Sequence, residues 1–126
     1  MNKNYQLGLL HLVHLLVSAD GVIDEKEKAA LLRIKEIEEI PDDVYVEFEA
    51  TIPNRKEREI YNDGIDFINR CSDAEKLHTF VILYKLSEVD GHVHIKEVRL
   101  LLYAIKVAGV EFDDLVHEAK KVVDIF

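Results

Sequence analysis

The fold is decided by two stretches of sequence, LVSADGVIDEKE at residues 16–27 and LSEVDGHVHIKE at residues 86–97. With an offset of 70 positions, the two stretches share the first leucine, the Asp-Gly pair and the final Lys-Glu pair. An Asp-Gly pair is typical of a tight turn, and each pair here stands between segments with helical spacing of apolar residues. The sequence therefore predicts a duplicated helix–(Asp-Gly)–helix unit, over about residues 5–40 and 73–109.

Apolar residues at helical spacing extend outward from both turns. They predict helices over about residues 5–19 and 25–40 in the first unit, and over about 73–89 and 95–108 in the second. The first of these is apolar on nearly every face, which is typical of a central, buried helix. Three more helices are expected over about residues 44–52, over about 55–70, and from Phe112 or Asp113 onward. The chain should therefore form a compact all-α bundle of about seven helices, a single domain over residues 1–126.

Residues suited to helix ends mark several of these boundaries. They are Asp24 with Glu27 and Ser72 with Glu75 as capping boxes, Pro41 as a helix start, and Gly109 as a left-handed C-cap. Gly64 stands inside the helix predicted over residues 55–70 and lowers its stability by ~1 kcal/mol relative to alanine.

The composition excludes several classes of protein. The 126 residues have a formal net charge of −9, and because an acidic chain repels phosphate backbones, no nucleic-acid partner is expected. An acidic surface suits a cation or a basic protein partner instead. No stretch approaches the ~20 apolar residues of a membrane span. The single cysteine, Cys71, allows no internal disulfide and no cysteine zinc site, which fits a cytoplasmic protein.

The two turns resemble the pattern of the TerB-like (tellurite-resistance) family, in which an apolar helix ends in Asp-Gly and a glutamate follows six residues after the glycine. The residues that match are Ala19-Asp20-Gly21 with Glu27, and Val89-Asp90-Gly91 with Glu97. The resemblance implies a compact helical bundle, a role in stress response and, for some members, metal binding through such acidic residues. The two copies differ at one position, since His94 stands where the first copy has Asp24.

The acidic side chains of the two turns are candidate metal ligands. One turn alone offers two carboxylates and a carbonyl, fewer than the ~6–8 oxygens that Ca²⁺ takes, but two facing turns would bring four carboxylates together. The predicted ligands are Asp20, Glu27, Asp90 and Glu97, with Asp24, His92 and His94 as additional candidates. Clustered carboxylates raise one another's pKa unless a cation neutralises them. Oxygen ligands favour Ca²⁺, Mg²⁺ or Mn²⁺, whereas the two histidines would shift the second turn toward Mn²⁺ or Zn²⁺.

A second interpretation of the turns needs no metal. Gly21 and Gly91 permit a positive φ where a helix ends, and Glu27 and Glu97 can cap the helix that follows. The aspartates are explained less well, because a carboxylate near a helix C-terminus opposes the helix dipole. In this interpretation the protein is a structural or interaction domain with an unidentified protein partner. Both interpretations remain open from the sequence.

No catalytic motif is evident, so the chain is not expected to be an enzyme, and a metal-assisted hydrolase built on the four carboxylates ranks last. The remaining histidines are assigned to structure. His11 and His14 share one face of a buried helix and are interpreted as core or boundary residues rather than a zinc pair, because no third ligand is apparent. His78 and His117 are interpreted as single surface or boundary residues.

Overall fold

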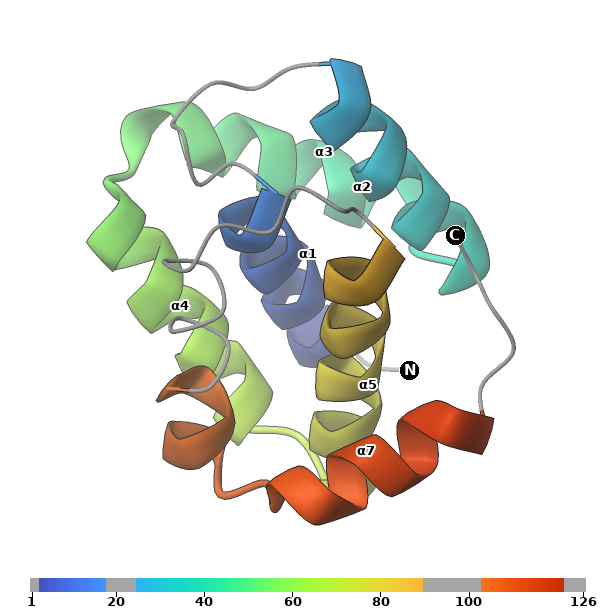
Figure 1. The fold of residues 1–126 in the computed structure, drawn as a ribbon. Coiled ribbons are helices and arrows are strands. Elements are labelled where there is room, and N and C mark those ends of the chain that lie inside the picture. Colours follow the sequence, from blue (N-terminus) through green and yellow to red (C-terminus); the bar gives the residue numbers. More distant parts are fainter. Residues whose placement is uncertain (1–2, 18–24, 90–102, 122–126) are drawn as a thin grey trace.

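The computed structural model of the chain describes residues 3–17, 25–89 and 103–121, and these residues form an all-helical bundle (Figure 1). The helices are α1 (Lys3–Val17), α2 (Glu25–Ile37), α3 (Asp42–Thr51), α4 (Glu57–Asn69), α5 (Asp73–Val89) and α7 (Phe112–Lys121), with a 3-10 turn, η1 (Ile52–Asn54), before α4. Residues 103–108 are also helical. The described part of the chain contains no β-strand, so the predicted all-α class is confirmed there.

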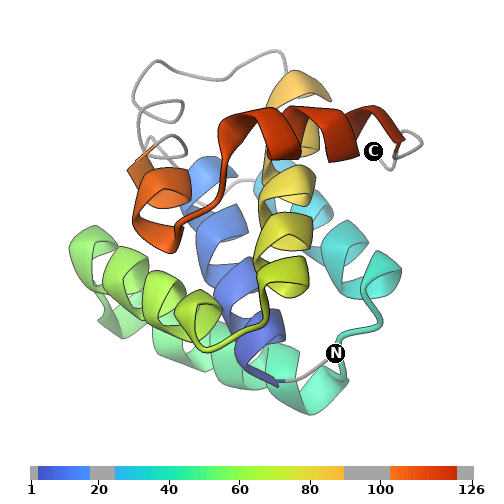
Figure 2. The same ribbon diagram turned by 90° about the horizontal axis from the view of Figure 1, so that it is seen from below.

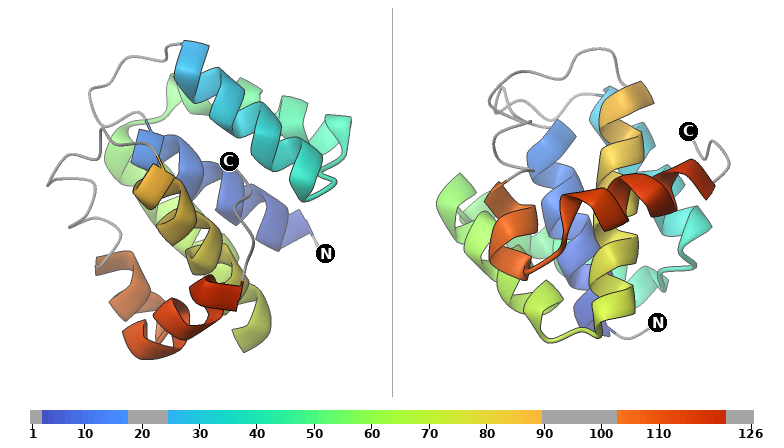
Figure 3. Two further views of the ribbon diagram at one scale, coloured as in Figure 1. Left: turned by 45° about the vertical axis from the view of Figure 1, so that its right-hand side comes forward. Right: turned by 60° about the horizontal axis from the view of Figure 1, so that its bottom comes forward.

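The central helix of the bundle is α1, as its sequence predicts. It contacts α2, α3, α4 and α5, and two further views show it enclosed by them (Figure 2, Figure 3). Its buried apolar side chains cover every face, and they are Tyr5, Leu7, Leu9, Leu10, Leu12, Val13, Leu15 and Leu16. A helix apolar all round can be stable only when neighbours cover it on all sides. The outer layer continues with α7, which packs against α5.

Two glycines set how closely α1 and α4 approach each other. A Cβ atom added at Gly8 would lie 2.6 Å from Cδ1 and 2.7 Å from Cγ1 of Ile68, and one added at Gly64 would lie 3.1 Å from Cβ of His11. Both glycines are buried where the two helices meet. The weakening of α4 expected from Gly64 is therefore compensated by close packing of the two helices, which a side chain at either position would obstruct.

The starts of α3 and α5 follow the predicted caps. The Ser72 hydroxyl accepts a hydrogen bond from the Glu75 N–H at 3.2 Å, and the Glu75 carboxylate accepts one from the Ser72 N–H at 3.0 Å. This reciprocal pair is the predicted capping box of α5. Pro41 is the N-cap of α3, as predicted. The capping box predicted for Asp24 and Glu27 lies outside the described side chains.

The start of α4 differs from the prediction by two residues. Pro53 is part of the separate turn η1, and Arg55, which follows it, has an extended backbone with φ −119° and ψ 143°. The Arg55 guanidinium pairs with the Asp63 carboxylate on the second turn of the helix. Because Arg55 leaves the helical conformation, α4 begins only at Glu57.

Two helix ends have the same geometry at positions 70 residues apart. Glu39 follows α2 with φ 53°, and Gly109 follows the helical residues 103–108 with φ 76°. Ile40 N–H donates to the Lys35 carbonyl at 2.9 Å, and Val110 N–H donates to the Ile105 carbonyl at 3.1 Å. Both ends are Schellman motifs, in which a residue in the left-handed region turns the chain and later N–H groups satisfy the last helix carbonyls. The predicted C-cap role of Gly109 is confirmed.

Replacing Glu39 with glycine should stabilise the protein by about 0.5–1 kcal/mol. A side chain in the left-handed region is strained, and glycine occupies that region without the strain, although it also adds entropy to the unfolded chain. Chemical denaturation would measure the gain in free energy of unfolding. The matched control is Glu36→Gly, one turn earlier in α2, where glycine should cost about 1 kcal/mol because the backbone is helical. Equal effects of the two substitutions would contradict this account of the helix end.

The same offset of 70 residues relates other elements. Helix α3 begins at Asp42 and α7 at Phe112, again 70 positions apart. The contacts correspond as well, because α3 packs on α1 and α7 packs on α5. These matches lie beyond residues 40 and 109, where the units predicted from the sequence end. Helix α4 and η1 have no counterpart among the described residues.

Candidate functional site

Most of the predicted metal ligands lie outside the described residues. These are Asp20, Asp24, Asp90, His92, His94 and Glu97. Glu27 falls in the first turn of α2, but its side chain is outside the description. The geometry of the candidate site is therefore given by the helices that lead into the two turns.

Those two helices, α1 and α5, lie side by side and run in the same direction (Figure 1, Figure 3). Their C-terminal residues, Val17 and Val89, are at the same end of the bundle. Asp20 follows three residues after the end of α1, and Asp90 follows directly after the end of α5. Asp20-Gly21 and Asp90-Gly91 thus follow, along the sequence, two helices whose C-terminal ends lie at the same end of the bundle.

The last turns of α1 and α5 favour a positive charge near them. The C-terminus of an α-helix has a partial negative charge from its last carbonyl groups, and here two such ends point the same way. No Lys or Arg stands in the last turn of either helix: the last turn of α5 has no basic residue, and His14 is the basic residue in that of α1. The C-terminal ends of α1 and α5 therefore both favour a positive charge nearby.

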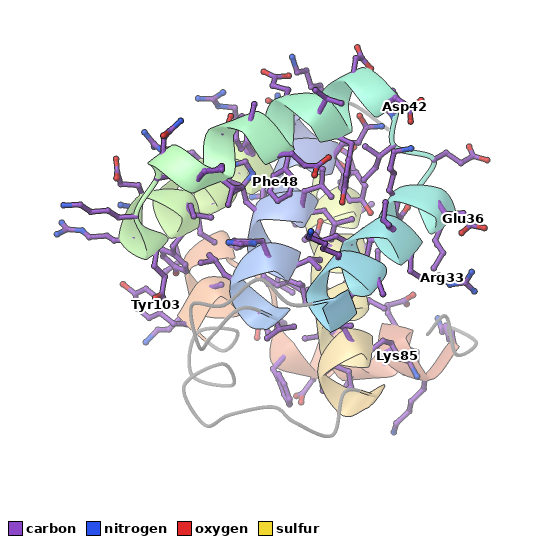
Figure 4. All side chains as sticks on the ribbon, turned by 90° about the horizontal axis from the view of Figure 1, so that it is seen from above. Arg33, Glu36, Asp42, Phe48, Lys85 and Tyr103 are labelled. Atoms are coloured by element: carbon purple, nitrogen blue, oxygen red, sulfur yellow. The ribbon has the colours of Figure 1, made fainter. Side chains whose placement is uncertain are left out.

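The histidines of α1 are core residues, as the sequence indicated. His11 is buried, and its Nδ1 lies 2.6 Å from the Leu7 carbonyl oxygen. Its ring packs against Phe67 and edge-on against Phe48, which points from α3 toward α1 (Figure 4). Burial lowers the pKa of His11, so the ring is neutral at pH 7. Within residues 3–17, 25–89 and 103–121, no three His, Cys, Asp or Glu side chains are grouped to hold a metal.

One polar cluster was not anticipated from the sequence. His78 Nε2 on α5 lies 2.8 Å from the Glu38 carboxylate, which follows the end of α2. The two residues are 40 positions apart, and neither belongs to a local motif, so only the tertiary fold brings them together. The buried Tyr5 ring lies beneath His78, with ring centroids 6.0 Å apart. His78 is therefore half-buried, as expected for a boundary residue, but it is paired with Glu38 rather than single.

No family model, no curated protein and no solved structure matches this chain. Among the described helices, none has both the length and the apolar character required to cross a membrane.

Proposed function

We propose that this chain is a non-enzymatic, TerB-like module of the stress-response type that binds a divalent cation between its two Asp-Gly turns. The ligands would be Asp20 and Glu27 from the first turn and Asp90 and Glu97 from the second. The observation that supports this proposal most is the parallel pairing of α1 and α5, whose adjacent C-terminal ends lead directly into the two turns.

The proposal includes an internal duplication, in which α1 to α3 correspond to α5 to α7. Two features support it at one offset: the two Schellman motifs, and the starts of α3 at Asp42 and of α7 at Phe112. A pseudo-two-fold axis parallel to α1 and α5 would relate the halves and would bring equivalent residues of the two turns toward each other.

The chemistry of the four carboxylates also supports a cation. Acidic side chains brought together without a counter-ion repel each other and raise one another's pKa. The oxygen ligands of four carboxylates suit a hard cation such as Ca²⁺, Mg²⁺ or Mn²⁺. Water or backbone carbonyls would complete the coordination. His92 and His94 would favour Mn²⁺ or Zn²⁺ if they also bind.

Thermal melting of the chelated protein, with Ca²⁺, Mg²⁺, Mn²⁺ and Zn²⁺ added singly, tests the proposal. One ion at ~100 times its dissociation constant should stabilise the protein by ~2.7 kcal/mol. The double variant Asp20→Asn/Asp90→Asn should lose this response. Without ions, the same variant should be as stable as the natural protein or more stable, because it relieves the repulsion between carboxylates.

The matched control is Asp43→Asn/Asp113→Asn. These two exposed aspartates stand in the first turns of α3 and α7, at the same offset of 70, and their replacement changes the net charge equally. The control variant should keep the full response to the ion, which separates specific binding from general screening of the acidic surface. If no ion alters the melting temperature, the turns are helix caps, and the alternative of a metal-free interaction domain takes the place of the proposal.

A further inference from the structure

The hydrogen bond between His78 and Glu38 joins the two halves of the bundle. Glu38 follows α2, in the half formed by α1 to α3, and His78 lies on α5, in the half formed by α5 to α7. The Glu38 side chain is only 10% exposed, whereas the His78 side chain is 39% exposed. A carboxylate that is nearly buried depends on its partner, while the imidazole can still exchange its proton with solvent.

Tyr5 on α1 lies near both members of this pair. The Tyr5 hydroxyl on α1 is near Glu38, and burial, followed by the charge of Glu38 and a hydrogen bond with it, raises the pKa of Tyr5 far above its usual range. Tyr5 therefore stays protonated at every relevant pH. Glu75 on α5 and Cys71 before it act on Tyr5 more weakly. Glu38 is the charged group that affects the pKa of His78. Because Tyr5 stays protonated, the His78 imidazole is the group of this cluster that titrates near neutral pH.

We propose that His78 and Glu38 form a proton-dependent clamp, in which the imidazolium of His78 holds the C-terminal turn of α2 against α5 and loss of its proton loosens that turn. The hydrogen bond can persist when the imidazole is neutral with hydrogen on Nε2, but it then loses the attraction between opposite charges. Hydrogen bonds between charged partners are roughly twice as strong as neutral ones. This clamp does not depend on the binding of a cation.

The direction of the effect follows from the pKa of His78. The hydrogen bond with Glu38 raises that pKa above its ordinary value of 6.5, against the opposing effect of burial. A group whose pKa is higher in the folded state stabilises the fold fully at pH values below its unfolded pKa. This stabilisation is lost as the pH rises through the higher, folded pKa. The clamp is therefore closed in mildly acidic solution and loosened in mildly alkaline solution.

The amides at the end of α2 report directly on the clamp. The N–H groups of Glu38, Glu39 and Ile40 donate to the carbonyls of Ile34, Glu36 and Lys35. The exchange of these amides can be measured by NMR and corrected for the intrinsic effect of pH on exchange. Their protection should fall roughly 3- to 5-fold as His78 loses its proton. This is the ratio expected between a charged and a neutral hydrogen bond at a partly exposed site. The same spectra give the pKa of His78, separately from His92 and His94.

Two variants and one control decide the outcome. In Glu38→Gln, the pKa of His78 should drop below its value in the natural protein, and the protection of the three amides should no longer follow pH. In His78→Gln, which keeps a donor near the position of Nε2, the protection should also be independent of pH. His117→Gln removes an exposed histidine of α7 and should behave as the natural protein. Protection that is flat with pH in the natural protein, or a pKa of His78 unchanged by Glu38→Gln, would overturn the proposal.

Discussion

Leu10→Ala and Phe80→Ala should each lower the free energy of unfolding by about 3–5 kcal/mol. Both side chains are fully buried, Leu10 in α1 and Phe80 in α5, and the two positions correspond at the offset of 70 residues. Each substitution removes buried apolar atoms and leaves a cavity that close-packed neighbours fill only in part. Because typical domains are stable by only about 5–15 kcal/mol, either loss is a large fraction of the total.

Denaturant unfolding of the two variants, beside exposed controls, measures this effect. Leu32→Ala and Phe112→Ala are matched in chemistry, and these side chains are 53% and 45% exposed. The controls should lose about 1 kcal/mol or less, since substitutions at the surface remove little buried area. A small loss at Leu10 or Phe80, comparable with its control, would mean that α1 or α5 is not at the centre of the packing.

Gly8→Ala should lower the free energy of unfolding by about 1–3 kcal/mol, although alanine is the better helix former by ~1 kcal/mol. The new Cβ would overlap the side chain of Ile68, which is completely buried, and would lie 3.2 Å from the Gly64 carbonyl oxygen. Ile68→Ala should cost about 2–5 kcal/mol through the cavity it creates. The double variant should cost less than the sum of the two, because the alanine at position 8 then fills space that Ile68 has vacated.

A double-mutant cycle in denaturant measures this coupling between Gly8 and Ile68. We expect a favourable interaction energy of about 1–2 kcal/mol, in the range found for residues in direct contact. Additive losses, or a stabilising Gly8→Ala, would show that α1 and α4 do not cross as closely as the structure has them.

The helices were predictable because their signals are local. The spacing of apolar residues in α1, the reciprocal cap of Ser72 and Glu75 and the terminating Gly109 all act within a few positions of one another. The 70-residue offset was also visible, since Asp-Gly is a short and distinctive pair. The match between the starts of α3 and α7 was not visible, because the two helices share little sequence.

Features that depend on distant residues could not be predicted. The role of Gly64 in helix packing depends on the crossing of α1 and α4, which are distant in sequence. Likewise, nothing near Glu38 in the sequence indicates His78 as its partner. Glu39 at a left-handed helix end violates the usual preference for glycine, so its neighbours gave no signal for the turn. The acidic turns remain a prediction, supported by the helices that lead into them.

The most direct test of the central claim is a calorimetric titration of the chelated protein with the ion that raises its melting temperature. If Asp20 and Asp90 share one site, the natural protein should bind one ion per chain, and Asp20→Asn and Asp90→Asn should each abolish that binding on their own. The control Asp43→Asn/Asp113→Asn should bind as the natural protein does. Two independent ions per chain, with one retained in each single variant, or no binding of any of the four ions, would contradict a cation shared between the paired turns.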